Sequence, residues 1–229
     1  MIISRKALMR SNILMLATLY GRLCLTMAEN LGCEIMKWPV KWEKRTSKSH
    51  PIKVDWFSYP TFAGKIGITL CPGKRQPMSW SGGWNRDLET DIGDITKMGT
   101  SAVISLIDED EMIDLHVSNL GEVVTKHEMD WIHLPLGDTT VPSDDFILAF
   151  VEMVPIITAG LESGDKIVIH CKGGLGRAAT IASMILGLYG ESAEDSINKI
   201  RKKRSSSCIN PAQERFLLEN CRVNKSRAV

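Results

Sequence analysis

The sequence has almost no net charge and lacks closely paired cysteines. Its 28 Lys and Arg residues nearly balance its 27 Asp and Glu residues, which leaves a formal charge of +1. Proteins that bind nucleic acid or anionic membranes through their overall field carry a clear excess of basic residues. We therefore expect neither nucleic acid nor stable membrane insertion in its function.

The six cysteines are scattered, and none forms a Cys-x-x-Cys pair. That spacing is typical of zinc sites and redox motifs, so the sequence predicts no metal site. The spacings also do not indicate the disulfide framework of a small secreted domain. The simplest expectation is a reducing compartment, the cytoplasm.

Length and composition predict one substantial domain with an N-terminal extension. Residues 1–49 carry nine basic and three acidic residues, a net charge of +6, whereas the rest of the chain is acidic. The apolar run 13–20 in this extension is too short to span a bilayer. It fits an amphipathic surface helix, a targeting segment, or residues upstream of a true start at Met27 or Met36. We expect the folded domain over residues 50–222 and a polar tail over 223–229.

Strand-like and helix-like patterns alternate through the domain, which predicts an α/β fold: a mainly parallel central sheet with helices on both faces. Ligands in such sheets bind at the carboxyl ends of the strands. Pro155 should kink or split its helix, and the basic run 199–204 is interpreted as a solvated helix end. We expect strands over 51–58, 65–70, 102–107, 131–136 and 166–169, and helices over 88–98, 108–117, 120–127, 144–162, 178–189, 192–203 and 212–221.

The segment Lys166–Thr180, KIVIHCKGGLGRAAT, combines a short buried strand, a glycine-rich loop and an alanine-rich helix. This arrangement directs successive backbone N–H groups and a helix N-terminus at one anion. Only the thiolate form of a cysteine is nucleophilic, and N–H donors around Cys171 favour that form. The same donors can bind phosphoryl oxygens, and the Arg177 guanidinium can bridge two of them. The segment therefore predicts phosphoryl transfer to Cys171.

Spacing alone does not carry this prediction. Cys221 and Arg227 are also separated by five residues, but the intervening RVNKS contains no glycine and follows no apolar strand. We interpret that second match as coincidence. The prediction of phosphoryl transfer depends instead on the strand before Cys171 and the glycines after it.

The HCKGGLGR loop resembles the signature loop of the cysteine-based protein phosphatases, and within them the kinase-associated branch of the dual-specificity phosphatases. The resemblance covers about residues 52–218. It implies the protein-tyrosine-phosphatase-like fold, a phosphoprotein substrate (phosphotyrosine, phosphoserine or phosphothreonine), a phosphocysteine intermediate and no cofactor. It also implies that the loop binds the phosphoryl group through Arg177 and through Lys172, Gly173, Gly174, Leu175 and Gly176, while His170 orients the loop.

The general acid implied by the resemblance is an aspartate on a loop upstream of the cysteine. Asp138 lies 33 residues before Cys171, directly after a predicted strand. Asp144 and Asp145 are alternatives, although acidic residues are expected in the first turn of a helix for its dipole alone. We expect Asp138 to protonate the leaving group.

Ala178 departs from the family pattern, and the roles of two further features, Gln213 and one loop, have more than one interpretation. Ala178 stands where Ser or Thr is usual, so release of the phosphoryl group from cysteine is expected to be slow. Gln213 is a candidate for positioning the attacking water, or it caps a helix after Asn210. The loop from Pro72 to Trp84 is either a packed lid over the sheet edge or a wall of the substrate cleft that supplies Lys74 and Arg75.

Two other functions remain as alternatives. The first is a catalytically weak phosphatase-like module that binds phosphoproteins, which Ala178 favours. The second is a rhodanese-like sulfurtransferase, which also uses a loop cysteine and would leave Asp138 without a role. The leucine at position 175, where lipid-phosphate phosphatases carry a second basic residue, disfavours a phosphoinositide substrate.

Overall fold

The computed structural model describes residues 44–77 and 82–221, all within the second of two compact units, residues 42–229. The apolar run 13–20 and most of the extension lie outside the described residues, as does Arg227.

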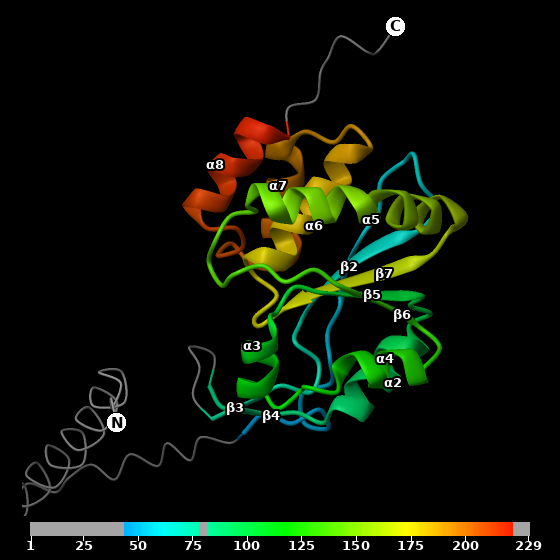
Figure 1. Ribbon diagram of the computed structural model, residues 1–229, viewed down its shortest axis with the longest axis vertical. Helices are drawn as coiled ribbons and strands as arrows, with labels where there is room; N and C mark the ends of the chain where they lie inside the picture. The colour runs from blue at the N-terminus through cyan, green and yellow to red at the C-terminus, as the bar shows by residue number, and fades with distance from the viewer. Residues whose placement is uncertain (1–43, 78–81, 222–229) are drawn as a thin grey trace, which may run out of the picture. The chain divides into compact units, whose positions relative to one another are not determined.

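A five-stranded sheet lies at the centre of the described unit, in the order β1-β2-β7-β5-β6 (Figure 1). Only β1 is antiparallel to its neighbour, so the predicted mainly parallel sheet is confirmed. A separate two-stranded sheet pairs β3 with β4. The strands are β1 (Asp55–Phe57), β2 (Lys65–Leu70), β3 (Arg75–Gln76), β4 (Trp84–Asn85), β5 (Ala102–Ser105), β6 (Asp130–His133) and β7 (Lys166–Cys171).

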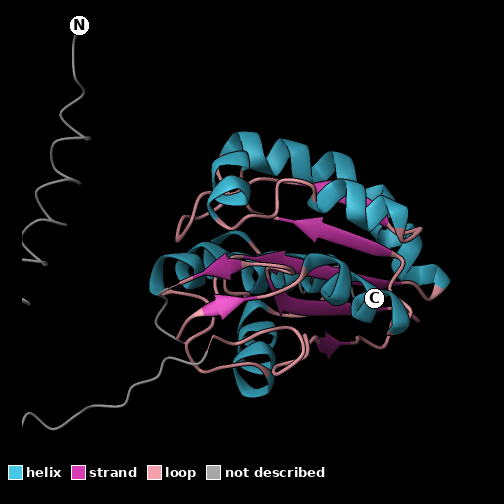
Figure 2. Ribbon diagram, turned by 90° about the horizontal axis from the view of Figure 1, so that it is seen from below, coloured by secondary structure: helices cyan, strands magenta, loops and turns pink. Residues whose placement is uncertain are grey.

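Helices cover both faces of the sheet, as predicted (Figures 1 and 2). Each face has its own hydrophobic core, because alternate residues of a strand point to opposite sides. In β7, Ile167 and Ile169 belong to one core and Val168 to the other. The helices α2 (Leu88–Lys97), α3 (Glu109–Asp114) and α4 (Leu120–Lys126) lie on one side, and α5 (Asp144–Ser163), α6 (Arg177–Leu188), α7 (Ala193–Lys203) and α8 (Pro211–Asn220) lie on the other.

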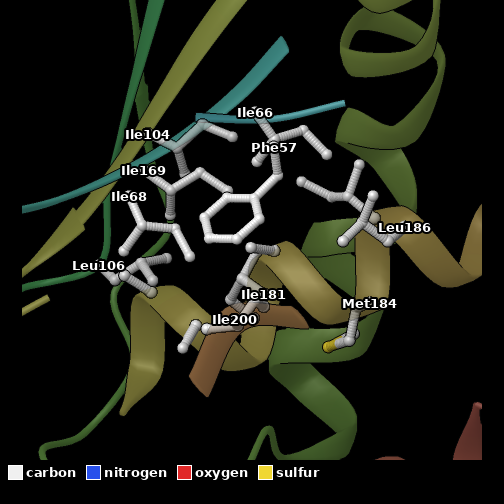
Figure 3. Packing of buried hydrophobic residues seen from close by; sticks show 14 of the residues in the cluster. Phe57, Ile66, Ile68, Ile104, Leu106, Ile169, Ile181, Met184, Leu186 and Ile200 are labelled. Atoms are coloured by element: carbon white, nitrogen blue, oxygen red, sulfur yellow. The ribbon is translucent and has the colours of Figure 1, made fainter. Parts of the chain in front are cut away.

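The larger core packs the sheet against α6 and α7. Phe57 lies at its centre, between Ile169 of β7 and Ile181 of α6 (Figure 3). Helix α6 is buried nearly all round, as its sequence predicts: ten consecutive residues from Arg177 to Leu186 are buried. This packing fixes the N-terminus of α6 directly behind the loop that follows β7.

Helix α5 is continuous across Pro155, so the predicted split is wrong. A proline removes the N–H that would bond the carbonyl four residues earlier. Here that carbonyl belongs to Val151, and both Val151 and Pro155 lie on the exposed side of the helix, away from the core. By length and composition α5 could cross a membrane, with 22% of its apolar window buried. Its Phe146, Phe150, Ile157 and Leu161 are part of the core.

The basic run 199–204 forms the end of α7 as predicted, and Lys202 and Lys203 are exposed, but the run is more than a solvated end. Lys199 pairs with Glu191, and Arg201 with Glu214 at 2.7 Å. Lys203 donates to the Trp56 carbonyl, and Arg204 pairs with Asp55 at 2.8 Å. The run therefore ties α7 to β1 and to α8.

Candidate active site

Strand β7 places Cys171 at the carboxyl edge of the sheet, where the sequence predicts the site. Cys171 is only 3% exposed, and the Gly174 N–H points at its Sγ at 3.2 Å. Gly174 has φ +66°, and a Cβ there would lie 2.2 Å from the Thr69 carbonyl oxygen. Only glycine fits such a position. The close approach lets the loop curl back over the sulfur.

Arg177 is the first residue of α6, and its guanidinium is buried. Nη1 donates to Glu111 Oε2 at 2.5 Å and Nη2 donates to Glu111 Oε1 at 2.9 Å, a bidentate pair. Nη1 also donates to the carbonyls of Leu136 at 2.8 Å and Leu106 at 3.3 Å. Burial opposes the charge of Arg177, but the hydrogen bonds to Glu111 and the nearby anions raise its pKa.

Two strands end earlier than predicted, and the residues that follow them supply these carbonyls. Expected strands 102–107 and 131–136 end as ladders at Ser105 and His133. Beyond those points Leu106 and Leu136 present their carbonyls to Arg177. The strand ends are therefore part of the cradle that fixes the guanidinium.

Asp138 lies on the loop after β6, with its Oδ1 3.0 Å from Arg177 Nη2. Its side chain is 57% exposed, so the carboxyl faces the pocket opening and solvent. Asp144 lines a different pocket, between α5, α6 and α8. Asp144 and Asp145 occupy the first turn of α5, behind the Ser143 cap. Of the three candidate acids, Asp138 is the one beside Arg177.

Two side-chain amides at the start of α8 hold the Asp138 loop. Asn210 Nδ2 donates to the Thr139 carbonyl and Gln213 Nε2 donates to the Thr140 carbonyl, both at 3.0 Å. Asn210 and Gln213 also form a reciprocal capping box, the cap that the sequence suggested for Gln213. Thr139 has φ +60°, a conformation uncommon for threonine. We call these two contacts the amide latch.

His170 precedes the nucleophile and is completely buried. Its Nε2 is hydrogen-bonded to Ser105 Oγ at 2.7 Å, and Trp131 Nε1 donates to the same oxygen at 2.8 Å. Burial lowers the pKa of His170 to about 3. The ring is therefore neutral at physiological pH.

Arg204 and Glu111 were not identified from sequence. The Arg204 guanidinium donates to the Gly174 carbonyl and the Ile68 carbonyl, the latter at 3.0 Å, and pairs with Asp55. Arg204 therefore binds the outer side of the signature loop, whereas the Arg177 guanidinium lies inside the site. Both residues reach the site from distant segments, so no local pattern marks them.

One pocket of about 560 Å³ brings most of the predicted residues together; His170 and Gly174 are not among its lining residues. Among the described residues no group of three or more His, Cys, Asp and Glu side chains is arranged to bind a metal ion. The pocket is lined by Lys74, Gln76, Asp138, Thr139, Cys171, Lys172, Gly173, Leu175, Gly176, Arg177, Ser207, Asn210 and Gln213.

Comparison with known proteins decides the family. Residues 77–217 match the model described as "PTP-SAK: Swiss Army Knife protein, DSP-PTPase phosphatase domain". The chain belongs to this family. The predicted dual-specificity phosphatase resemblance is therefore confirmed.

Individual relatives agree with this family. Cyclin-dependent kinase inhibitor 3 of Sus scrofa is 24% identical over 166 residues, which cover 69% of this chain and 73% of the relative. The tyrosine-protein phosphatase cdc-14 of Caenorhabditis elegans is 34% identical over 96 residues, 42% of this chain and 13% of that one.

A solved structure confirms the fold. It is that of kinase-associated phosphatase with a serine in place of the catalytic cysteine, and it matches with a TM-score of 0.66 and 25% identity. The match covers 74% of this chain and 93% of the other.

Proposed function

We propose that this phosphatase domain hydrolyses phosphomonoesters of phosphoproteins through a phosphocysteine formed on Cys171. The observation that carries the proposal is that Cys171, Arg177 and Asp138 line one pocket at the end of β7, with the Gly174 N–H directed at the sulfur. We assign the activity to residues 50–222 and expect it in a reducing compartment such as the cytoplasm.

In the first step the Cys171 thiolate attacks phosphorus and the P–O bond to the leaving group breaks. Asp138 in its protonated form gives its proton to the departing oxygen. Loop amides and the Arg177 guanidinium stabilise the charge on the three equatorial oxygens. Asp138 is paired with Nη2 of Arg177 in this structure. When substrate binds, a phosphoryl oxygen takes the place of the Asp138 carboxyl at Nη2, and the carboxyl is then free to turn toward the leaving group.

In the second step water attacks the phosphocysteine, the P–S bond breaks, and the Asp138 carboxylate takes the proton of the water. Ala178, fully buried behind Arg177, offers no hydroxyl to the departing sulfur. The next hydroxyl, Thr180 Oγ1, donates to the Gly176 carbonyl at 3.1 Å. Loss of one donor to a developing charge slows a step by about 10²–10³-fold, so we expect the second step to limit turnover.

The test is release of phosphate and phenol from a generic aryl phosphate. Wild-type protein releases both products with a chelator present, and Cys171→Ser releases neither. Cys221→Ser, at the other Cys-x5-Arg match, is the control and keeps the wild-type rate. Activity retained by Cys171→Ser, or lost with the chelator, contradicts the mechanism.

A second candidate, a phosphoprotein-binding module with poor turnover, is favoured by Ala178. Rapid mixing separates the two. An enzyme shows a burst of one equivalent of phenol followed by steady release. A burst without further release indicates the binding module, and Ala178→Ser should then restore turnover.

A further inference from the structure

We propose that Lys74 is a second fixed cation of the phosphoryl pocket, which binds the anion held at Cys171 together with Arg177. The inference rests on the proposed function, because it concerns the same pocket. Lys74 lies in the turn between β2 and β3, far in sequence from the signature loop. The parallel pairing of β2 with β7 brings this turn to the loop, with Leu70 opposite Cys171.

The ammonium of Lys74 is fixed in place. Lys74 is 4% exposed and still lines the pocket that contains Cys171 and Arg177. Its Nζ donates to the Lys172 carbonyl at 3.1 Å and lies 4.9 Å from the centroid of the Trp84 ring. An ammonium has three N–H donors, so donor capacity remains for a ligand in the pocket.

No carboxylate neutralises this charge. Within the described ranges 44–77 and 82–221, no Asp or Glu lies within ion-pair distance of Lys74, whereas its neighbour Arg86 is paired with Asp91 at 2.7 Å. A buried cation without an anion is costly unless its site normally receives one. The unbalanced charge therefore points to an anionic ligand.

The titration of Lys74 agrees with this position. Burial lowers the pKa of Lys74 to about 8; the negative charge of Cys71 and Cys171 in their thiolate forms opposes that change, and the cations Arg86 and Lys172 add to it. Lys74 is thus mainly protonated at neutral pH. An anion beside it raises this pKa, so anion affinity should fall as the pH rises through about 8.

The existing ion pairs of Arg177 explain why further positive charge is needed in the pocket. Arg177 already shares its charge with Glu111 and Asp138. A phosphoryl dianion next to a thiolate carries more negative charge than this arginine balances. Lys172, in the loop, supplies one more positive charge, and Lys74, whose Nζ donates to the Lys172 carbonyl, supplies another.

The first experiment measures alkylation of Cys171, which needs no turnover. Iodoacetate is anionic and iodoacetamide is neutral, but both react with the thiolate. We expect Lys74→Met to slow iodoacetate by about tenfold relative to iodoacetamide. Lys74→Arg should retain the wild-type ratio, and Lys97→Met, at an exposed lysine, is the control. An unchanged ratio in Lys74→Met overturns the proposal.

The second experiment measures binding of inorganic phosphate, by its protection of Cys171 from iodoacetamide. Lys74→Met should require about tenfold more phosphate for half protection, and in wild type the requirement should rise above pH 8. Equal protection in wild type and Lys74→Met contradicts the proposal. If phosphate protection depends on Lys74 but no aryl phosphate is hydrolysed, the proposed function fails and the anion site stands. Thermal melting of each variant verifies that it is folded.

Discussion

The position of the Arg177 guanidinium is set by ion pairs with residues outside the signature loop. Glu111 holds both terminal nitrogens of the guanidinium from α3, and Asp138 occupies the side that faces the pocket. A bidentate carboxylate fixes the plane of a guanidinium as well as its charge. Glu111 should therefore act as a positioning residue for phosphoryl binding.

Replacement of Glu111 with Gln tests this role. The amide can accept one hydrogen bond but cannot form the bidentate ion pair, and a hydrogen bond to a charged group contributes about 1.5–3 kcal/mol. We expect kcat/KM for an aryl phosphate to fall by about 10–100-fold, chiefly through KM. Glu109→Gln, on an exposed position of the same helix, should leave it unchanged, and a loss confined to kcat would contradict a positioning role.

Single residues also show what the sequence could predict. Cys171, the glycines and Arg177 follow one another along the chain, so their joint role is readable from local pattern. Glu111 lies 66 residues from Arg177, and Arg204 lies 30 residues from the loop carbonyl that it binds. Such partners are chosen by tertiary packing. A sequence of alternating strands and helices does not reveal them.

At the scale of elements, α8 controls the loop that carries Asp138. The amide latch joins Asn210 and Gln213 to the two residues after Asp138. Because Thr139 holds an uncommon backbone conformation, the loop needs outside contacts to keep it. Loss of the latch should misplace the general acid and leave the nucleophile intact.

Leaving-group dependence is the measurement for the latch. A nitrophenolate departs without a proton, whereas an alkoxide or simple phenoxide needs one. We expect Asn210→Ala to slow hydrolysis of a poor leaving group by about 10–100-fold, and that of p-nitrophenyl phosphate by much less. Glu219→Ala, near the opposite end of α8, is the control. An equal loss for both substrates would indicate general damage to the pocket.

The sequence predicted the presence and type of the helices and strands better than the residues at which they begin and end. The central strands and all the main helices of the described domain lie where periodicity indicates, because long apolar patterns follow burial. Two departures from the prediction have local causes. Pro155 is tolerated on the exposed side of α5, and the basic run at the end of α7 also finds partners on β1 and α8.

At the scale of the whole molecule, strand β7 contributes residues to both hydrophobic cores and also carries the nucleophile. Strand β7 lies between β2 and β5, contributes to the packing on both faces, and ends in His170 and Cys171. The nucleophile is thus attached to a strand that is buried at every residue but its first. A consequence is that a titratable ring, His170, lies inside the molecule with its Nδ1 unpaired among the described residues.

This buried ring makes fold stability depend on pH. His170 has a pKa of about 3 in the folded protein, whereas an unfolded chain has about 6.5. Between these values the unfolded state binds a proton that the folded state does not, so the free energy of unfolding falls as the pH is lowered. We expect the free energy of unfolding to fall by about 1.4 kcal/mol for each pH unit below pH 6.5, until the pH nears 3.

Urea unfolding at pH 7.5, 6, 5 and 4 measures this slope in wild type and in His170→Asn. The asparagine does not titrate, so the variant is less stable at pH 7.5, where a packed ring has been lost, and the gap to wild type narrows as the pH falls. His116→Asn is the matched control, since His116 is exposed at φ +59°, a conformation that asparagine adopts readily. A gap that stays constant from pH 7.5 to pH 4 would show that His170 is protonated without unfolding, and would place water or a mobile strand end beside Cys171.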